Sequence, residues 1–166
     1  MYEQPEDLTR LQSVLDASYE RAGAHLRTVF VARKRISAEE LPELLPGVQI
    51  LSLATVTAAG EPRVAPVDGL FFRGAFWFGS DPNSARFRHI RRRPAVSADH
   101  IRGEELAILV HGTAQVIDHN APEHAAFRAY CVETYGEKWL EFGPPAMYAR
   151  IEAKAMFAHT LGNWEE

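Results

Sequence analysis

The segment from Ser84 to Arg93 has the residue types and spacing of a binding site for a small anion. Ser84 follows a turn sequence and is expected to cap a helix that carries Arg86 and Arg88 in its first turns. The free N–H groups and the positive end of such a helix attract a phosphate, and an arginine donates to it through paired hydrogen bonds. Residues 82–98 contain no acidic side chain. The pattern indicates a phosphate site, although a solvated helix face has the same composition.

A second candidate lies closer to the N-terminus, where a predicted strand reads Arg63-Val64-Ala65-Pro66-Val67. Proline has no N–H to donate to a sheet and is tolerated only at an edge or a bulge. Such a break frees backbone groups of Val64, Ala65 and Val67 to meet the polar edge of a flat heterocycle. For the proline taken alone, an ordinary edge strand is the simpler interpretation.

The aromatic run Phe76-Trp77-Phe78 lies between these two candidates and leads into Gly79-Ser80. Successive side chains of a strand point to opposite faces, so Trp77 and Phe78 face different environments. We take Trp77 as the candidate to line a ring pocket, with Phe78 packing in the core. For aromatic residues in a strand, burial of both in the core is the commoner outcome.

Charge and motifs exclude several function classes. The net charge of −4 and the pI near 6.0 argue against a general nucleic-acid binder. The longest apolar runs are far shorter than the roughly 20 residues that cross a membrane. Glycine-rich nucleotide loops, HExxH and GxSxG are absent. The spacing of His119 and His124 favours two surface side chains over a pair of metal ligands. Cys131 is the single cysteine, so we expect it to pack in the interior of a cytoplasmic protein.

The hydrophobic pattern changes period near residue 48, which separates a helical N-terminus from a region of strands. Apolar residues at steps of three and four predict one long amphipathic helix from residue 6 to about residue 35. Ser37 and Glu40 form a capping box that predicts a second, short helix from Ser37. The strands are predicted at 48–56, 63–72, 75–79, 95–101, 105–117 and 147–159, with helices at about 84–93 and 120–135.

Six strands with few intervening helices predict a mainly β fold with flanking helices, in the form of a six-stranded antiparallel barrel. A doubly wound fold needs a helix after nearly every strand, whereas residues 48–79 hold three predicted strands and no helix. A chain of 166 residues fits one domain with a terminal extension. We therefore assign residues 1–36 to an N-terminal helical extension and residues 37–166 to the barrel domain.

Together these segments resemble the pyridoxamine 5′-phosphate oxidase-like, FMN-binding split β-barrel family. The resemblance covers about residues 38–160 and rests on Leu53–Val56, Gly60–Val67, Ser84–Val96 and Gly112–Val116. It implies a split barrel of Greek-key topology, a homodimer, and FMN bound in the cleft between the subunits. It also implies an oxidoreductase that acts on a small molecule.

Carried over by position, the resemblance places Arg63, Val64, Ala65, Pro66 and Val67 beside the isoalloxazine ring. The residues implied to hold the phosphate are Ser80, Ser84, Arg86 and Arg88. The family has Lys at the position of Arg86, which keeps the charge, and Asn at the position of His89. No catalytic acid or base is assigned, because the nearby titratable residues His89, Asp68 and His111 are each expected to be structural.

The family resemblance leaves the substrate and the cofactor open. Genuine pyridoxamine phosphate oxidases carry a C-terminal motif rich in Trp, Gly and Arg that is absent from residues 147–166, so oxidation of vitamin B6 is not expected. Other members of the superfamily use the deazaflavin F420, and some bind haem. The alternatives are therefore an F420-dependent reductase, or a flavin, F420 or haem carrier or sensor without enzymatic activity.

The N-terminal extension needs a surface on which to bury its apolar stripe, because an isolated amphipathic helix is marginal in water. Its own barrel, the partner subunit and a different protein are the three choices. We expect the partner subunit, since a helix there would cover the open edges of both barrels.

Overall fold

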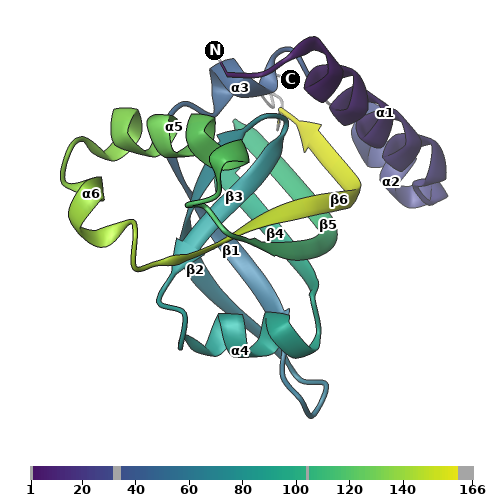
Figure 1. The fold of residues 1–166 in the computed structure, drawn as a ribbon. Coiled ribbons are helices and arrows are strands. Elements are labelled where there is room, and N and C mark those ends of the chain that lie inside the picture. Colours follow the sequence, from purple (N-terminus) through teal and green to yellow (C-terminus); the bar gives the residue numbers. More distant parts are fainter. Residues whose placement is uncertain (1, 32–34, 104, 161–166) are drawn as a thin grey trace.

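The computed structural model describes residues 2–31, 35–103 and 105–160, and it contains a closed antiparallel barrel of six strands (Figure 1). Around the barrel the strands follow the order β1-β2-β3-β6-β5-β4. Their bounds are β1 (Val48–Val56), β2 (Pro62–Phe72), β3 (Ala75–Ser80), β4 (Ala95–Arg102), β5 (Leu106–Ile117) and β6 (Met147–His159). The predicted six-stranded barrel is thereby confirmed.

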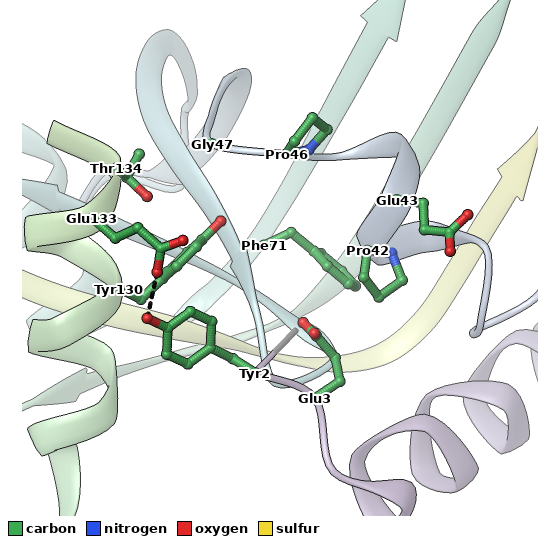
Figure 2. Close-up of a pocket in the computed structure, with 10 residues that line it drawn as sticks. All are labelled: Tyr2, Glu3, Pro42, Glu43, Pro46, Gly47, Phe71, Tyr130, Glu133 and Thr134. Atoms are coloured by element: carbon green, nitrogen blue, oxygen red, sulfur yellow. Dashed lines mark hydrogen bonds between the residues drawn. The ribbon is translucent and has the colours of Figure 1, made fainter.

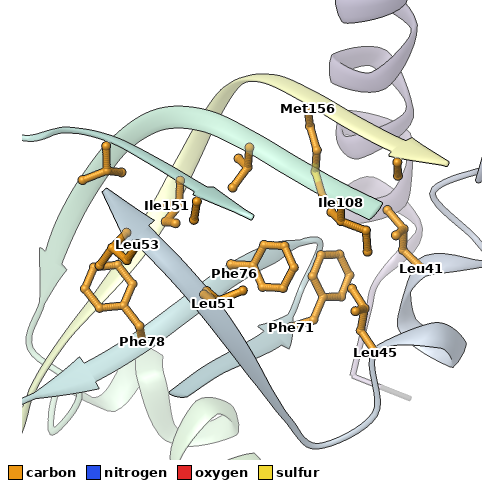
Figure 3. Close-up of a cluster of buried hydrophobic side chains, with 14 of the residues drawn as sticks. Leu41, Leu45, Leu51, Leu53, Phe71, Phe76, Phe78, Ile108, Ile151 and Met156 are labelled. Atoms are coloured by element: carbon orange, nitrogen blue, oxygen red, sulfur yellow. The ribbon is translucent and has the colours of Figure 1, made fainter. Parts of the chain in front are cut away.

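The interior of the barrel holds the main hydrophobic core. Alternation along β1 buries Leu51 and Leu53 and leaves Ser52 exposed, which is the period-two pattern of a strand with one buried face. Figure 3 shows how side chains from several strands meet inside the barrel. They include Leu51, Leu53, Phe71, Phe76, Phe78, Ile108, Ile151 and Met156.

In the described residues, seven helical segments lie around the barrel: α1 (Pro5–Arg21), α2 (Ala24–Val31), α3 (Leu41–Leu44), α4 (Ala85–Arg92), the 3-10 turn η1 (Pro122–His124), α5 (Ala125–Tyr135) and α6 (Trp139–Phe142). Helices α5 and α6 pack on the outside of the barrel over a second cluster that contains Trp77, Phe127 and Trp139. Within it, the indole N–H of Trp139 donates to the hydroxyl of Tyr148 at 2.8 Å. None of the described helices combines the length and the apolarity needed to cross a membrane.

The N-terminal prediction of one long helix is wrong. The segment forms two helices, because α1 ends at Arg21 and α2 begins at Ala24. The backbone of Ala22 leaves the helical region, and Gly23, the poorest helix former after proline, follows it. The predicted capping box is present, since Glu40 Oε2 accepts from the backbone N–H of Ser37 at 2.9 Å, but the helix that follows spans only α3.

Helix α1 buries its apolar stripe on its own barrel, which corrects the expectation that the partner subunit covers it. Strand β6 pairs with β3 only through residues 147–150, so its later residues have an open edge. Two polar side chains of α1 occupy that edge. Ser18 Oγ accepts from the N–H of Met156 at 2.9 Å, and the hydroxyl of Tyr19 donates to the carbonyl of Ala158 at 2.7 Å. The helix therefore acts as an edge cover within one chain.

Candidate functional site

The first half of β2 is a strand edge. Residues 62–68 pair with β1, whereas β3 pairs with β2 only from Gly69 onward. The side of β2 that faces away from β1 is therefore open over these residues. Pro66 lies in this open stretch, where its missing N–H costs no ladder bond.

The backbone of Pro66 shows which groups of this edge are free. Arg86 of α4 donates from its guanidinium to the carbonyl of Pro66 at 2.8 Å, so that carbonyl points away from β1. In an antiparallel strand, each residue directs its N–H and C=O to the same side, and neighbours alternate. Val64 therefore shares the open side with Pro66, while the backbone groups of Ala65 and Val67 face β1. The expectation that Val64, Ala65 and Val67 all offer free backbone groups is therefore wrong for Ala65 and Val67. Only Val64 of the three has its backbone groups on the open side.

Helix α4 directs its N-terminus toward the same region. Ser84 caps the helix, and its hydroxyl accepts from the N–H of Phe87. The first N–H groups of a helix lack partners within it, so those of Ala85 and Arg86 are available to an anion. Buried Phe87 and Ile90 fix the helix to the barrel below it, which explains how a strongly basic segment holds one orientation.

These elements enclose a cavity of about 420 Å³, which we call the β2–α4 cavity. This volume is in the range of small-molecule sites. Six of the ten residues predicted for the cofactor line it: Arg63, Val64, Ala65, Ser80, Ser84 and Arg86. Residues far apart in the sequence thus meet around one space.

Four of the predicted residues do not line the cavity. Trp77 is buried in the outer cluster beneath α5, where its indole N–H donates to the carbonyl of Phe72 at 3.0 Å. Val67 is buried inside the barrel. Arg88 turns back to donate to the carbonyl of Asn83, and Pro66 takes part through its carbonyl bond to Arg86.

The structure also adds lining residues that the sequence did not suggest as site residues: Leu53, Thr55 and Ala85. His89 lines the cavity as well, and its Nδ1 lies 2.8 Å from the hydroxyl of buried Thr55. This bond links α4 to β1 and fixes the imidazole, so His89 supports the wall of the site. The other two titratable candidates do not line the cavity: Asp68 is exposed on β2, and His111 bonds Ser97 on the outside of β4 and β5.

The charge of the β2–α4 cavity is positive. Its lining includes Arg63 and Arg86 and no acidic side chain among the described residues. Burial lowers the pKa of Arg86, and the nearby carboxylate of Asp68 opposes this shift, so the guanidinium stays charged. Arg63 forms an exposed ion pair with Glu61 at 2.7 Å, a weak contact that a bound anion can replace.

The donor set fits a phosphate-bearing cofactor. Two guanidinium groups, a serine hydroxyl and the N-terminus of α4 surround the space, and the open edge of β2 borders it. In contrast, no group of three or more His, Cys, Asp or Glu side chains in the described segments is arranged to hold a metal ion. Cys131 is buried, and burial raises the pKa of its thiol to about 12, in agreement with the predicted packing role.

Comparison with known proteins agrees with this geometry. The family model described as pyridoxamine 5′-phosphate oxidase matches residues 37–161. Among curated proteins, no sequence matches this chain.

Solved structures share the fold at low identity. An FAD-binding protein from Mesorhizobium loti has a TM-score of 0.60 and 17% identity, covering 77% of this chain and 96% of its own. The haem storage protein from Vibrio cholerae has a TM-score of 0.56 and 17% identity, covering 67% and 86%. An F420 reductase has a TM-score of 0.52 and 18% identity, covering 69% and 94%.

Proposed function

The chain belongs to the pyridoxamine 5′-phosphate oxidase family, and from that membership we propose that it is an FMN-binding oxidoreductase acting on a small molecule. The observation that carries the proposal is the β2–α4 cavity. It gathers two arginines, a helix N-terminus and an open strand edge around a space of small-molecule size.

In this proposal the phosphate of FMN lies against Ser84, Arg86 and the first N–H groups of α4. The isoalloxazine ring lies along the open edge of β2, where Val64 offers its backbone N–H and C=O to the polar rim of the ring. When bound, the flavin supplies the hydride and electron transfer, and the protein binds it, orients it and excludes water from one face. We assign no protein side chain to proton transfer.

We also propose that the protein is a homodimer, with the cofactor touching both chains. The outer face of β1, β2 and β4 supports this, because Ile50, Val64 and Ile101 are each more than half exposed there. Exposed apolar residues grouped on a sheet face are typical of a subunit interface. Light scattering should give twice the chain mass of 18.6 kDa, and a monomer that keeps its cofactor would contradict the proposal.

We place the protein in the cytoplasm, where a reduced Cys131 persists.

Two alternatives use the same cavity. An F420-dependent reductase would direct the acidic tail of its cofactor to the same arginines, and a solved F420 reductase shares the fold. A carrier of flavin, F420 or haem without enzymatic activity is the second alternative, supported by the likeness to a haem storage protein. Oxidation of vitamin B6 is not part of the proposal.

The deciding experiment is the absorption spectrum of the purified protein, before and after the cofactor is released by heat. The two bands of oxidised flavin support the proposal, whereas the single visible band of F420 or the Soret band of haem would replace FMN by that cofactor. Turnover of reduced nicotinamide with an added acceptor then separates an enzyme from a carrier. A protein that binds FMN but shows no turnover with any acceptor would be a carrier.

A further inference from the structure

A second cavity lies at the end of the barrel opposite α4, beside the N-terminus and α3 (Figure 1). It encloses about 450 Å³, and we call it the α3–α5 cavity. Four parts of the chain form it: the N-terminal Tyr2 and Glu3, the segment from Pro42 to Gly47, Phe71 of β2, and the α5 residues Tyr130, Glu133 and Thr134. It shares no lining residue with the β2–α4 cavity.

Aromatic rings form much of its wall. The ring of Tyr2 lies 5.1 Å from that of Tyr130 and 5.5 Å from that of Phe72, so the N-terminal segment is docked rather than loose. Phe71 of β2 adds a third lining ring. Figure 2 shows Tyr2 between Glu133 and Glu3, with Phe71 across the cavity. Aromatic faces carry negative charge density and attract cations.

The charge of this wall is negative among the residues that the structure describes. Glu3, Glu43 and Glu133 line the cavity, and none of its described lining residues is basic. The hydroxyl of Tyr2 donates to Glu133 at 2.5 Å, which holds that carboxylate beside the rings. In the described part of the chain, no basic side chain forms an ion pair with any of the three.

The arrangement does not suit a metal ion. A metal needs three or more ligands converging on one point, and the described side chains include no such group. The three carboxylates instead come from separate segments around a space much larger than an ion. A ligand that contacts them must bring both positive charge and apolar surface.

We propose that the α3–α5 cavity binds a small organic ammonium ion. Its positive charge is attracted by the carboxylates of Glu133 and Glu3, and its hydrocarbon part lies against the rings of Tyr2, Tyr130 and Phe71. This combination of an aromatic wall with acidic groups is how proteins commonly recognise amines. The site is separate from the proposed cofactor site, and its test requires no cofactor and no turnover.

The test is isothermal titration of the full chain with three probes of nearly equal size: phenethylammonium, neutral 2-phenylethanol and anionic 3-phenylpropionate. We expect phenethylammonium to bind at least about tenfold more tightly than either analogue, because only the cation gains from the carboxylates and the rings together. The preference should shrink in high salt, since screening weakens exposed charge interactions.

Variants assign the binding to this cavity. Glu133→Gln and Glu3→Gln should each weaken phenethylammonium binding about three- to fivefold, the effect of one partly exposed charge. Tyr130→Leu removes a ring and should weaken it about fivefold. Glu137→Gln is the matched control, because it removes an exposed carboxylate just beyond α5 that is not among the lining residues. Circular dichroism melting checks that each variant folds.

Three results would overturn the proposal. The first is no binding of phenethylammonium at millimolar concentration by the folded protein. The second is equal binding of the three probes, which would mean that the cavity binds them through apolar contacts and does not select for positive charge. The third is unchanged binding in both Glu133→Gln and Glu3→Gln, or an equal loss in Glu137→Gln, which would place the cation elsewhere.

Discussion

Replacing Arg86 by alanine should weaken the binding of FMN by about 1.5–3 kcal/mol, the range for hydrogen bonds to charged groups. This corresponds to roughly a 10- to 150-fold higher dissociation constant, at about 1.36 kcal/mol for each factor of ten. The prediction tests whether the β2–α4 cavity holds the phosphate of the cofactor.

The structure explains why the effect should be this large. Arg86 is already fixed by its bond to the carbonyl of Pro66 at 2.8 Å, so binding a phosphate costs little further side-chain entropy. One of its five N–H donors is used there, and the others remain for the anion. Asp68 is close enough to interact with the charge of Arg86 in the free protein, so the anion is not its first charged neighbour.

Two further variants act as controls. Arg92→Ala removes a guanidinium from the end of the same helix, where Arg92 is exposed and is not among the lining residues, so it should leave the affinity within about twofold. Arg86→Lys keeps the charge but loses the planar fork, so its loss should be intermediate.

The assay is the quenching of flavin fluorescence when the cofactor-free protein is titrated with FMN and, separately, with riboflavin. Riboflavin lacks the phosphate, so Arg86→Ala should leave its affinity nearly unchanged while that of FMN falls. Equal losses for both ligands would mean that Arg86 supports the ring or the fold. An unchanged FMN affinity would remove Arg86 from the site.

Three more predictions concern the fold. Tyr19→Phe removes the buried hydroxyl that bonds both backbone groups of Ala158, and urea unfolding should show a loss of about 2 kcal/mol; a loss below about 0.5 kcal/mol would mean that α1 does not cover the edge of β6. Stability should fall as the pH rises above 9, because the thiol of Cys131 ionises near its ordinary pKa of 9.0 when unfolded but only near about 12 when native. Cys131→Ala should flatten that decline, and an unchanged decline would assign it to other groups. Gly112→Ala places a Cβ 2.1 Å from the carbonyl oxygen of Glu152, so thermal melting should show a destabilisation of about 1–3 kcal/mol, and an unchanged melting temperature would mean that the β-bulge adjusts.

The strands were predictable because their signals are local. Alternation of buried and exposed residues marks β1, and turn residues such as Gly60 and Gly74 separate one strand from the next. The predicted strand at 147–159 coincides with β6. Each of these signals lies within a window of about ten residues, where pattern and propensity agree.

The partner of α1 was not predictable in the same way. The apolar stripe of α1 predicts that this face of the helix is buried, but it does not identify the surface that buries it. That surface is the open edge of β6, about 140 residues away in the sequence. That edge exists because β3 has six residues against the 13 of β6 and pairs only with residues 147–150, so the later residues of β6 have no strand on this side. Strand lengths around a closed barrel are a property of the whole sheet, so the sequence of α1 alone does not contain them.

The same limit explains the errors in the candidate site. Trp77 and Phe78 were known to face opposite sides, but which side each takes depends on the register of β3 between β2 and β6. The register turns Phe78 into the barrel and Trp77 toward α5. The contact between Thr55 and His89 likewise depends on the placement of α4 over the end of β1. No sequence motif at either residue predicts this contact.

The two cavities show why one binding site can be read from a sequence and another cannot. The positive β2–α4 cavity draws one of its two arginines and the N-terminus of α4 from one acid-free segment, residues 82–98, so a scan for charge runs finds it. The carboxylates of the α3–α5 cavity come from positions 3, 43 and 133, each surrounded by ordinary sequence. Only the closed barrel brings them together, because it places the N-terminus, α3 and α5 at one end (Figure 1). The net charge of −4 therefore does not reveal that the β2–α4 cavity is positive and the α3–α5 cavity negative. We expect an anionic ligand at the first end of the barrel and a cationic ligand at the other.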